Sequence, residues 1–598
     1  MDIIHNLVKF NSLRKNVQGG EASLMLAGGG SYLWMGRNSA SRYQGWFFES
    51  GKGLVKIIDN IYAKNAGGFL ALENNFWRAK RIWQNNVENF LLLGSDCLSY
   101  EINNPAEIEF FLDVKETYKN PEFGRHYSVW QENDLLMINY RQEKDFCLPE
   151  IFAAVCGDMG DIQIKNKWIC REYAFDKKRD SKPFKGWVFL PAAVFASKLI
   201  FVVGTDKKKT MARAREIWRN YEKIKKEKQR SIHAPSIFFA PVFASENEKE
   251  NLMARNCARN AINSLLCAPN SKPALRAGLP WFFQIWQRDE AISLAGLAIF
   301  DWQSAREIFW RQIDELKNND YRFNTADGIG WLFLAVGEFV KQNKFNQKEK
   351  REVFDCLRKS IDYLLENNTQ NDLAINDDCQ KTWMDSLNRS GAAIEIQALR
   401  LNMYSLAARL ANNKKEKGYY AGLKKDLKEK ICQKFLNKFQ LADKFDVDNN
   451  LADFTARPNI FLAAYIYPGL FSKSEWAKIF DWALPKLWLD WGGLSTIDKN
   501  DPRFCANDTG EDPKSYHNGD SWFWINNIAA IVLARTDYQK FEEYIEKIFN
   551  ASKNDILWHG AIGYASEISS AQNYEPRGCP NQAWSASAFL QLFRELRK

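Results

Sequence analysis

Acidic residues that lie among tryptophans are the side chains of this sequence best suited to catalysis. Residues 278–290 contain Trp281 and Trp286, and they end in an adjacent arginine and aspartate, Arg288 and Asp289, before an apolar run. Such a pair can hydrogen-bond several hydroxyl groups of one ligand. An aspartate that caps the following helix, with a surface ion pair beside it, explains the same residues equally well.

A second segment ends a long polar stretch with Thr-Trp-Met-Asp at positions 382–385. An aspartate beside Trp383 and Met384 is partly shielded from water, which raises its pKa toward that of a useful proton donor. Asp385 therefore suits a general acid. A cap for the helix that follows is an equal alternative.

A third segment, residues 516–524, alternates polar residues with the large rings of Tyr516, His517 and Trp522. The wall of a binding pocket and the start of a buried helix both fit this pattern.

The fourth segment contains Glu567, which lies in a predicted loop before the last amphipathic helix. A solvated loop position is the more common role for any single glutamate. Three side chains that can contact a ligand follow closely in the sequence: Arg577, Gln582 and Trp584.

Together these segments favour hydrolysis of a glycosidic bond. That reaction requires a proton donor at the leaving oxygen and a carboxylate that activates water or attacks the anomeric carbon. Aromatic rings also stack on the apolar faces of sugars, and 14 of the 22 tryptophans lie between Trp281 and Trp584. Most of these rings are expected in the core, so their excess adds only weak support.

The elements that must position these residues differ between the two ends of the chain. Residues 1–205 are predicted to be β-rich, with short aliphatic and aromatic runs at 108–118, 135–140 and 187–204. A charged helix is predicted for residues 211–230, before Pro235, so residues 206–245 are predicted to be a helical linker.

Residues 246–598 are predicted to contain about a dozen helices. Apolar residues recur at helical spacing, for example at Ala305, Phe309, Ile313 and Leu316. Paired helices in that number fit an α/α toroid of alternating inner and outer helices. A helical solenoid would have a similar count, but the sequence shows no internal repeat to support one.

Charge and hydropathy exclude two classes of partner. The net charge is +9, and the basic runs at 207–209 and 223–230 fit the solvated face of a helix better than a nucleic-acid patch. The apolar run 187–204 is interrupted by Pro191 and Lys198, so it predicts two buried strands instead of a membrane span. We therefore expect no nucleic-acid partner and no membrane partner.

Eleven cysteines without a CxxC pair, and a start that lacks the apolar core of a signal peptide, predict a cytoplasmic protein. The five histidines are far apart, so no metal-ligand spacing is present. Residues 446–450 begin like a calcium loop, but they lack its sixth-position glycine, and Arg457 stands where its glutamate belongs. No metal and no cofactor is expected, and nothing predicts an oligomeric state.

In their order along the chain, these segments resemble the amylo-α-1,6-glucosidase part of glycogen debranching enzymes. The resemblance rests on Pro-Trp-Phe at 280–282, Trp-Gln-Arg-Asp at 286–289, Thr-Trp-Met-Asp at 382–385, Ile-Glu-Ile-Gln-Ala-Leu at 394–399, Arg-Pro-Asn at 457–459, the Tyr-His to Trp-Phe-Trp segment at 516–524, and Pro-Arg-Gly-Cys-Pro-Asn-Gln-Ala-Trp-Ser at 576–585. The N-terminal part is similar, more weakly, to the β-sandwich of the shorter prokaryotic members, through Ser-Arg-Tyr-Gln-Gly-Trp-Phe at 41–47.

The resemblance implies an antiparallel β-sandwich followed by an (α/α)6 toroid that inverts the anomeric centre while it removes glucose from α-1,6 branch points of an α-glucan. It implies that Asp385 is the general acid and Glu567 the general base. The implied substrate-binding residues are Trp281, Trp286, Arg288, Asp289, Trp383, Tyr516, His517, Trp522, Arg577, Gln582 and Trp584.

The chain departs from the family pattern at Gln287, Glu290 and Ala393, and in the loop after Ile568. These changes bear on substrate choice more than on the reaction. One alternative is another toroidal α-glucosidase, acting on a trehalose-like, glucosylglycerate or α-1,4-glucan substrate. A second alternative is a glucan-binding protein without turnover.

Overall fold

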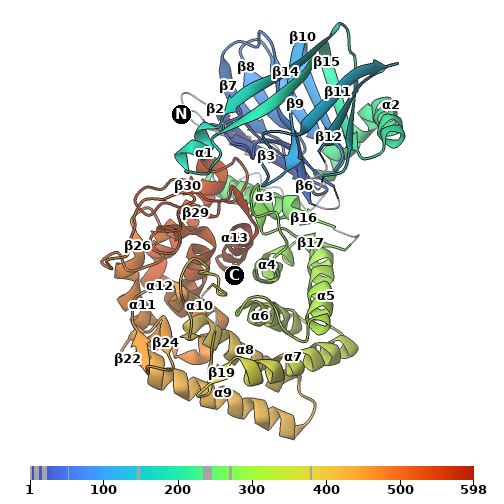
Figure 1. Ribbon diagram of the computed structural model, residues 1–598. Helices are drawn as coiled ribbons and strands as arrows, with labels where there is room; N and C mark the ends of the chain where they lie inside the picture. The colour runs from blue at the N-terminus through green and yellow to red at the C-terminus, as the bar shows by residue number, and fades with distance from the viewer. Residues whose placement is uncertain are drawn as a thin grey trace. The chain divides into compact units, whose positions relative to one another are not determined.

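In a computed structural model, the chain is described over residues 3–5, 13–16, 23–50, 53–143, 148–232, 246–268, 272–376 and 380–598. Its contacts divide it into two compact units, each shown in Figure 1. Unit 1 consists of Met1–Ser271, Gly278–Phe283 and Ile556–Tyr564, and unit 2 consists of Lys272–Ala277, Gln284–Asp555 and Ala565–Lys598. The predicted limits at 205 and 245 stay a prediction.

Unit 1 is built on one antiparallel sheet, in which fifteen strands are described. In chain order these are β1 (Ile3–His5), β2 (Leu13–Asn16), β3 (Ser23–Gly28), β4 (Ser31–Gly36), β5 (Gly45–Glu49), β6 (Leu54–Ala63), β7 (Phe69–Asn74), β8 (Ala79–Trp83), β9 (Val87–Leu92), β10 (Cys97–Glu116), β11 (Arg125–Glu132), β12 (Leu135–Gln142), β13 (Ile151–Gly157), β14 (Ile162–Glu172) and β15 (Lys185–Gly204). The predicted β-rich start of the chain is confirmed.

Two 20-residue strands, β10 and β15, hold the sheet together. Along its first half β10 pairs with β9, and after an irregularity between Glu101 and Ala106 it pairs with β6 instead. This exchange of partners bends the sheet into two arms, and β3 and β4 of one arm contact β9 of the other. The apolar side chains that face inward from both arms form the core of the unit.

The apolar run 187–204 forms part of one strand, β15, so the prediction of two separate strands there was wrong. Proline has no N–H to donate to a neighbouring strand. At Pro191 the pairing of β15 is irregular on both sides, next to Leu112 of β10 and opposite the 164–167 stretch of β14. The strand continues through these irregularities, which absorb the proline without ending the sheet.

Three helices also belong to unit 1: α1 (Ala174–Lys178), α2 (Lys207–Ile232) and α3 (Glu246–Leu265). The predicted charged helix is confirmed as α2. Its buried residues Ala214, Ile217 and Tyr221 pack on Cys156 and Val202 of the sheet. Four of its lysines, Lys208, Lys209, Lys223 and Lys226, are exposed to solvent.

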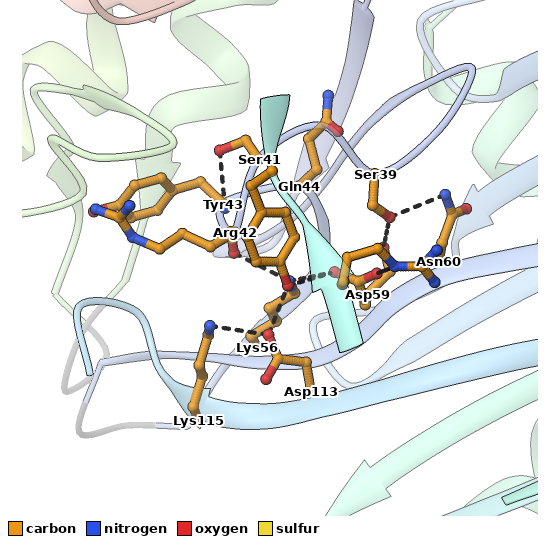
Figure 2. A network of polar contacts seen from close by, with 12 residues as sticks. Ser39, Ser41, Arg42, Tyr43, Gln44, Lys56, Asp59, Asn60, Asp113 and Lys115 are labelled. Carbon is orange, nitrogen blue, oxygen red and sulfur yellow. Dashed lines mark hydrogen bonds and ion pairs between the residues drawn. The ribbon is translucent and has the colours of Figure 1, made fainter. Parts of the chain in front are cut away.

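A network of charged side chains lies inside unit 1 (Figure 2). Lys56 Nζ lies 2.8 Å from Asp59 Oδ1 and 3.1 Å from Asp113 Oδ2. Asp113 also pairs with Lys115 at 2.9 Å and with Arg125 at 2.9 Å. Burial alone would raise the pKa of Asp113, but the charges of Lys115, Lys56 and Arg125 outweigh it and hold that pKa well below its usual value.

Removing the charge of Asp113 leaves three buried cations without their shared partner. We expect Asp113→Asn to lower the free energy of unfolding by about 3–5 kcal/mol at neutral pH. Because the folded-state pKa of Asp113 is depressed, this stabilisation is present above the usual aspartate pKa and is lost as the pH falls toward the folded-state value.

Urea titrations of the unit 1 transition at several pH values measure the effect. Asp134→Asn is the control, because Asp134 is exposed and pairs with Arg215 at 2.9 Å on the surface. Such pairs contribute about 0–1 kcal/mol. Equal losses in the two variants would contradict a stabilising role for the buried network.

Unit 2 is helical, as predicted. Its helices are α4 (Gln287–Leu297), α5 (Trp302–Asn318), α6 (Gly328–Lys341), α7 (Gln347–Asn367), α8 (Ile394–Leu410), α9 (Lys414–Phe435), α10 (Asn459–Ile466), α11 (Lys473–Leu487), α12 (Phe523–Asn554) and α13 (Ala583–Glu595). The apolar stripe predicted for α5 is fully buried, and Asp301 caps that helix by accepting from Ser304 N. The backbone of α12 is non-helical at Asp537, which divides it into two parts.

Six of these helices form a closed ring of contacts. The pairs in contact are α4 with α6, α6 with α8, α8 with α10, α10 with α12, α12 with α13, and α13 with α4. Helices α5, α7, α9 and α11 lie at the periphery of this ring (Figure 1). None of the helices in the described ranges combines the length and the apolar sequence needed to cross a bilayer.

Candidate active site

The predicted motifs lie at the N-terminal ends of the ring helices. Asp327, Trp522 and Gln582 directly precede α6, α12 and α13, while Asn459 is the first residue of α10 and Arg288 the second residue of α4. Asp385 lies in the loop before α8, which begins at Ile394. Contacts of Trp383 join several of these ends, because its backbone N–H donates to Asp327 at 3.1 Å and its indole N–H donates to Asn459 at 2.7 Å. The motifs therefore gather at one end of the ring.

Asp385 lies at the end of the Thr-Trp-Met-Asp segment, and its side chain is 48% exposed. Its Oδ2 lies 3.4 Å from Nη2 of Arg288, and the same guanidinium donates through Nη1 to Thr382 O at 2.8 Å. Partial burial raises the pKa of Asp385, while the charge of Arg288 opposes that rise. The carboxyl group is thus accessible to a ligand and shifted toward the protonated form that a general acid needs.

Glu567 is held much more tightly, since only 1% of its surface is exposed. Tyr516 donates its phenolic O–H to Oε1, and the backbone N–H of Cys579 donates to Oε2 at 2.8 Å. The pair of donors fixes the carboxylate in one orientation, as a general base requires.

Gly578 makes this orientation possible. Its φ is +64°, a conformation that glycine adopts without strain, and a Cβ at this position would lie 2.4 Å from Glu567 Oε2. The glycine of the Pro-Arg-Gly-Cys motif therefore leaves the space that the carboxylate occupies.

Tyr516 contacts Glu567 directly and interacts with Asp385 through the charge of that carboxylate. Burial and then the negative charge of Glu567 raise its pKa well above 10, and the charge of Asp385 adds to this rise. The phenol of Tyr516 therefore keeps its proton at neutral pH and remains a hydrogen-bond donor.

We expect Tyr516→Phe to lower kcat by about 10- to 100-fold, the effect of losing a hydrogen bond to a charged group. Steady-state kinetics and a thermal unfolding curve of each variant measure it. Tyr465→Phe is the control, since Tyr465 donates to the neutral Gln591 at 2.5 Å and should keep its kcat. Equal kcat values for the Tyr516 variant and the parent protein would show that Glu567 needs no such support.

The predicted aromatic residues form a buried cluster. Trp383 lies edge-on to Trp522 at 5.5 Å and to His517 at 5.4 Å, and His517 stacks on Trp522 at 5.1 Å. Trp584 lies 5.8 Å from Trp522. These rings are almost completely buried, so their packing on one another stabilises the loops to which they belong. Their direct contact with a sugar stays a prediction.

His517 is uncharged in this cluster. Burial lowers its pKa well below 6.5, and the charge of Arg457 adds to the effect. Its Nδ1 shares a hydrogen bond of 2.6 Å with Ser386 Oγ, one residue beyond Asp385. The imidazole thus connects the 516–524 segment to the loop that carries Asp385.

Arg288 and Asp289 lie in the first turn of α4, and both are buried. Burial raises the pKa of Asp289 to about 6, against the opposing charge of Arg288. Trp286, at the start of the same helix, is 43% exposed. An exposed ring beside a buried polar pair is a suitable arrangement for stacking on a sugar while its hydroxyl groups are held.

The remaining predicted residues have other surroundings. Trp281 belongs to unit 1, where its ring lies 6.1 Å from that of Trp34 and 4.0 Å from the guanidinium of Arg179. Arg577 pairs with Glu575 at 2.7 Å. Gln582 is buried, and its Oε1 accepts no hydrogen bond from any described residue. Their roles in binding stay predictions.

Two residues of the site were not predicted from the sequence. Asp327, before α6, contacts the acid loop, but an aspartate before an apolar helix reads as an ordinary cap. Cys579 acts through its backbone N–H, which no side-chain pattern reveals.

In the described part of the chain, no three His, Cys, Asp or Glu side chains are placed to hold a metal ion. The calcium-like residues form a hairpin turn, in which Asp446 accepts from Asp448 N at 3.1 Å and from Asn449 N at 3.0 Å.

The chain is similar in structure to known hydrolases. A bacterial glucoamylase complexed with acarbose matches it with a TM-score of 0.57 and 11% identity, over 97% of this chain and 96% of that one. A GH63 mannosylglycerate hydrolase from Thermus thermophilus, in complex with glucose, matches 57% of this chain and 99% of its own length at 13% identity and a TM-score of 0.44. The first likeness shows a shared fold. A comparison with curated proteins gives no match.

A family pattern covers most of the helical unit. The pattern described as Amylo-alpha-1,6-glucosidase matches residues 256–591, more than half of the 598 residues. The resemblance stated from the motifs is thereby confirmed. The chain belongs to the amylo-α-1,6-glucosidase family and is a glycoside hydrolase.

Proposed function

We propose that this hydrolase removes glucose from α-1,6 branch points of glycogen or a limit dextrin, with inversion at the anomeric carbon. The observation that carries the proposal is a pair of carboxyl groups in unequal surroundings. Asp385 is half exposed with a raised pKa, whereas Glu567 is buried and held by two donors. An inverting glycosidase needs two carboxyl groups with these unequal roles.

In the proposed reaction, Asp385 gives its proton to the O6 oxygen as the bond from that oxygen to C1 of the terminal glucose breaks. Glu567 takes a proton from a water whose oxygen attacks C1 on the opposite face. The products are β-glucose and the shortened glucan. Room for that water requires the carboxyl groups to lie ~6.5–9.5 Å apart.

Arg288 and Asp289 are proposed to hold the hydroxyl groups of this glucose, with Trp286 against its apolar face. The buried aspartate supports this role, because Asp289 Oδ2 has only an ion pair of 3.6 Å with Arg288 Nε and accepts no hydrogen bond of normal geometry from the described residues. A buried carboxylate oxygen without a donor gains a partner when a hydroxyl group arrives.

We infer that the six ring helices form the inner wall of an (α/α)6 toroid and that α5, α7, α9 and α11 belong to its outer layer. The two arms of the unit 1 sheet form the predicted β-sandwich. The proposed domains are residues 1–205, a linker at 206–245, and the toroid at 246–598.

No disulfide links the cysteines of the described residues, which agrees with the proposed cytoplasmic location.

The test is to incubate the pure protein with a limit dextrin that carries single-glucose α-1,6 stubs and to measure free glucose. Maltose, trehalose and glucosylglycerate are assayed in parallel. Rapid glucose release from the dextrin alone supports the proposal. Preferential turnover of one of the other three sugars favours another toroidal α-glucosidase, and glucan binding without any turnover favours a binding protein.

A further inference from the structure

We propose that Asp327 is a positioning residue of this site: its carboxylate holds the segment that carries Asp385 and balances the charge of Arg288 beside it. This inference rests on the proposed role of Asp385 as the general acid.

The position of Asp327 points to a role outside its own helix. It is the N-cap residue of α6, yet its side chain makes no capping hydrogen bond. Instead, Oδ2 accepts the backbone N–H of Trp383 at 3.1 Å. One residue earlier, Ala326 N donates to Lys381 O at 3.0 Å. The start of α6 is thus joined to the acid segment by two hydrogen bonds.

Other ring helices hold the same segment. From α4, Arg288 donates to Thr382 O at 2.8 Å, and from α10, Asn459 accepts the indole N–H of Trp383 at 2.7 Å. The residues just before Asp385 are therefore fixed from three helix ends. Asp385 itself keeps an exposed carboxyl group at the end of a rigid segment.

Asp327 also contributes charge. It is fully buried, and its Oδ1 accepts no hydrogen bond from any described residue. Among all the groups around Arg288, the charge of Asp327 contributes most to the raised pKa of that guanidinium, ahead of Asp289 and Asp385. The guanidinium thus lies among three carboxylates.

The charges that act on the Asp327 carboxyl group are those of Arg288, Glu395 and Asp289. Glu395 is already paired with Arg389 in a buried ion pair. Burial raises the pKa of Asp327 to about 6, and Arg288 opposes this rise. Asp327 is therefore ionised at neutral pH and offsets part of the positive field that Arg288 exerts on Asp385.

This arrangement has a specific consequence. Arg288 lowers the pKa of Asp385. When the charge of Asp327 is removed, less of the Arg288 field is offset, and Asp385 should lose its proton at lower pH. Asp327→Asn keeps an amide oxygen that can still accept from Trp383 N, so it removes the charge and retains the support.

The experiment compares the kcat of the full chain and of Asp327→Asn as a function of pH, on stub dextrin and on α-glucosyl fluoride. Fluoride leaves without a proton from an acid, so that substrate bypasses Asp385. On dextrin, we expect the alkaline limb of the Asp327→Asn profile to move down by about 0.5–1 pH unit. On the fluoride, kcat should stay within about twofold of the parent. Asp301→Asn, at the cap of α5, is the control and should shift neither profile.

An unshifted alkaline limb on dextrin would overturn the inference, and so would an equal loss on both substrates, which would mean general damage to the site. Both outcomes are distinct from failure of the proposed function, in which the parent protein releases no glucose from stub dextrin. Thermal unfolding of each variant confirms that the compared proteins are folded.

Discussion

Asp385→Asn is expected to lower kcat on stub dextrin by about 10²- to 10⁴-fold, the usual contribution of a general acid. An amide cannot give a proton to the O6 oxygen, so the leaving group departs as an unprotonated alkoxide. The loss should be much smaller on α-glucosyl fluoride, whose leaving group needs no proton. Initial rates on the two substrates measure this difference.

Asp481→Asn is the matched control for this variant. The side chain of Asp481 is also 48% exposed and also pairs with a cation, Lys540, in unit 2. It should retain full activity on both substrates. An Asp385 variant that lost dextrin and fluoride turnover equally would contradict its assignment as the acid.

Glu567→Gln should lose activity by a similar factor of about 10²–10⁴, but on both substrates. A water must be deprotonated whichever group leaves, so an activated leaving group does not replace the base. The amide is isosteric with the carboxylate, but its NH₂ group cannot accept the hydrogen bond that one of the two oxygens now receives from Tyr516 or from Cys579 N.

The two sets of rates together separate the roles of the two carboxyl groups. Glu595→Gln, in α13 and paired with Arg535 at 2.8 Å, serves as the control for a glutamate-to-glutamine change in the same unit. Recovery of the Glu567 variant on the fluoride would reverse the assignment, because it would make Glu567 the proton donor.

Much of the helical unit could be predicted from the sequence, because helical periodicity is a local signal. The stripe at Ala305, Phe309, Ile313 and Leu316 lies in the core of α5 as expected. The motifs also named Asp385 and Glu567 as candidates, because a resemblance to a family assigns roles to residues without knowledge of distances, and these two roles stay predictions. The ring closure between α13 and α4 is different, because it joins residues almost 300 positions apart and no local pattern encodes it.

The features that the sequence did not predict depend on non-local contacts. The apolar run 187–204 was expected to form two strands, but it lies in one, because neighbours on both sides of β15 adjust their pairing at Pro191. The rings of Trp383 and Trp522 pack on one another, a contact that the sequence did not reveal, and their contact with a sugar stays a prediction. Asp327 looks like a helix cap in the sequence, and only its contact with Trp383 reveals a different use.

The central claim is that Asp385 and Glu567 act on opposite faces of one glucose and invert its anomeric carbon. Proton NMR of the first glucose released from stub dextrin, recorded before the anomers equilibrate, tests it most directly. We predict that the H1 signal of β-glucose appears first and that the α signal grows only at the rate of mutarotation. An α signal that appears first would contradict inversion and would require a covalent intermediate on one of the two carboxylates.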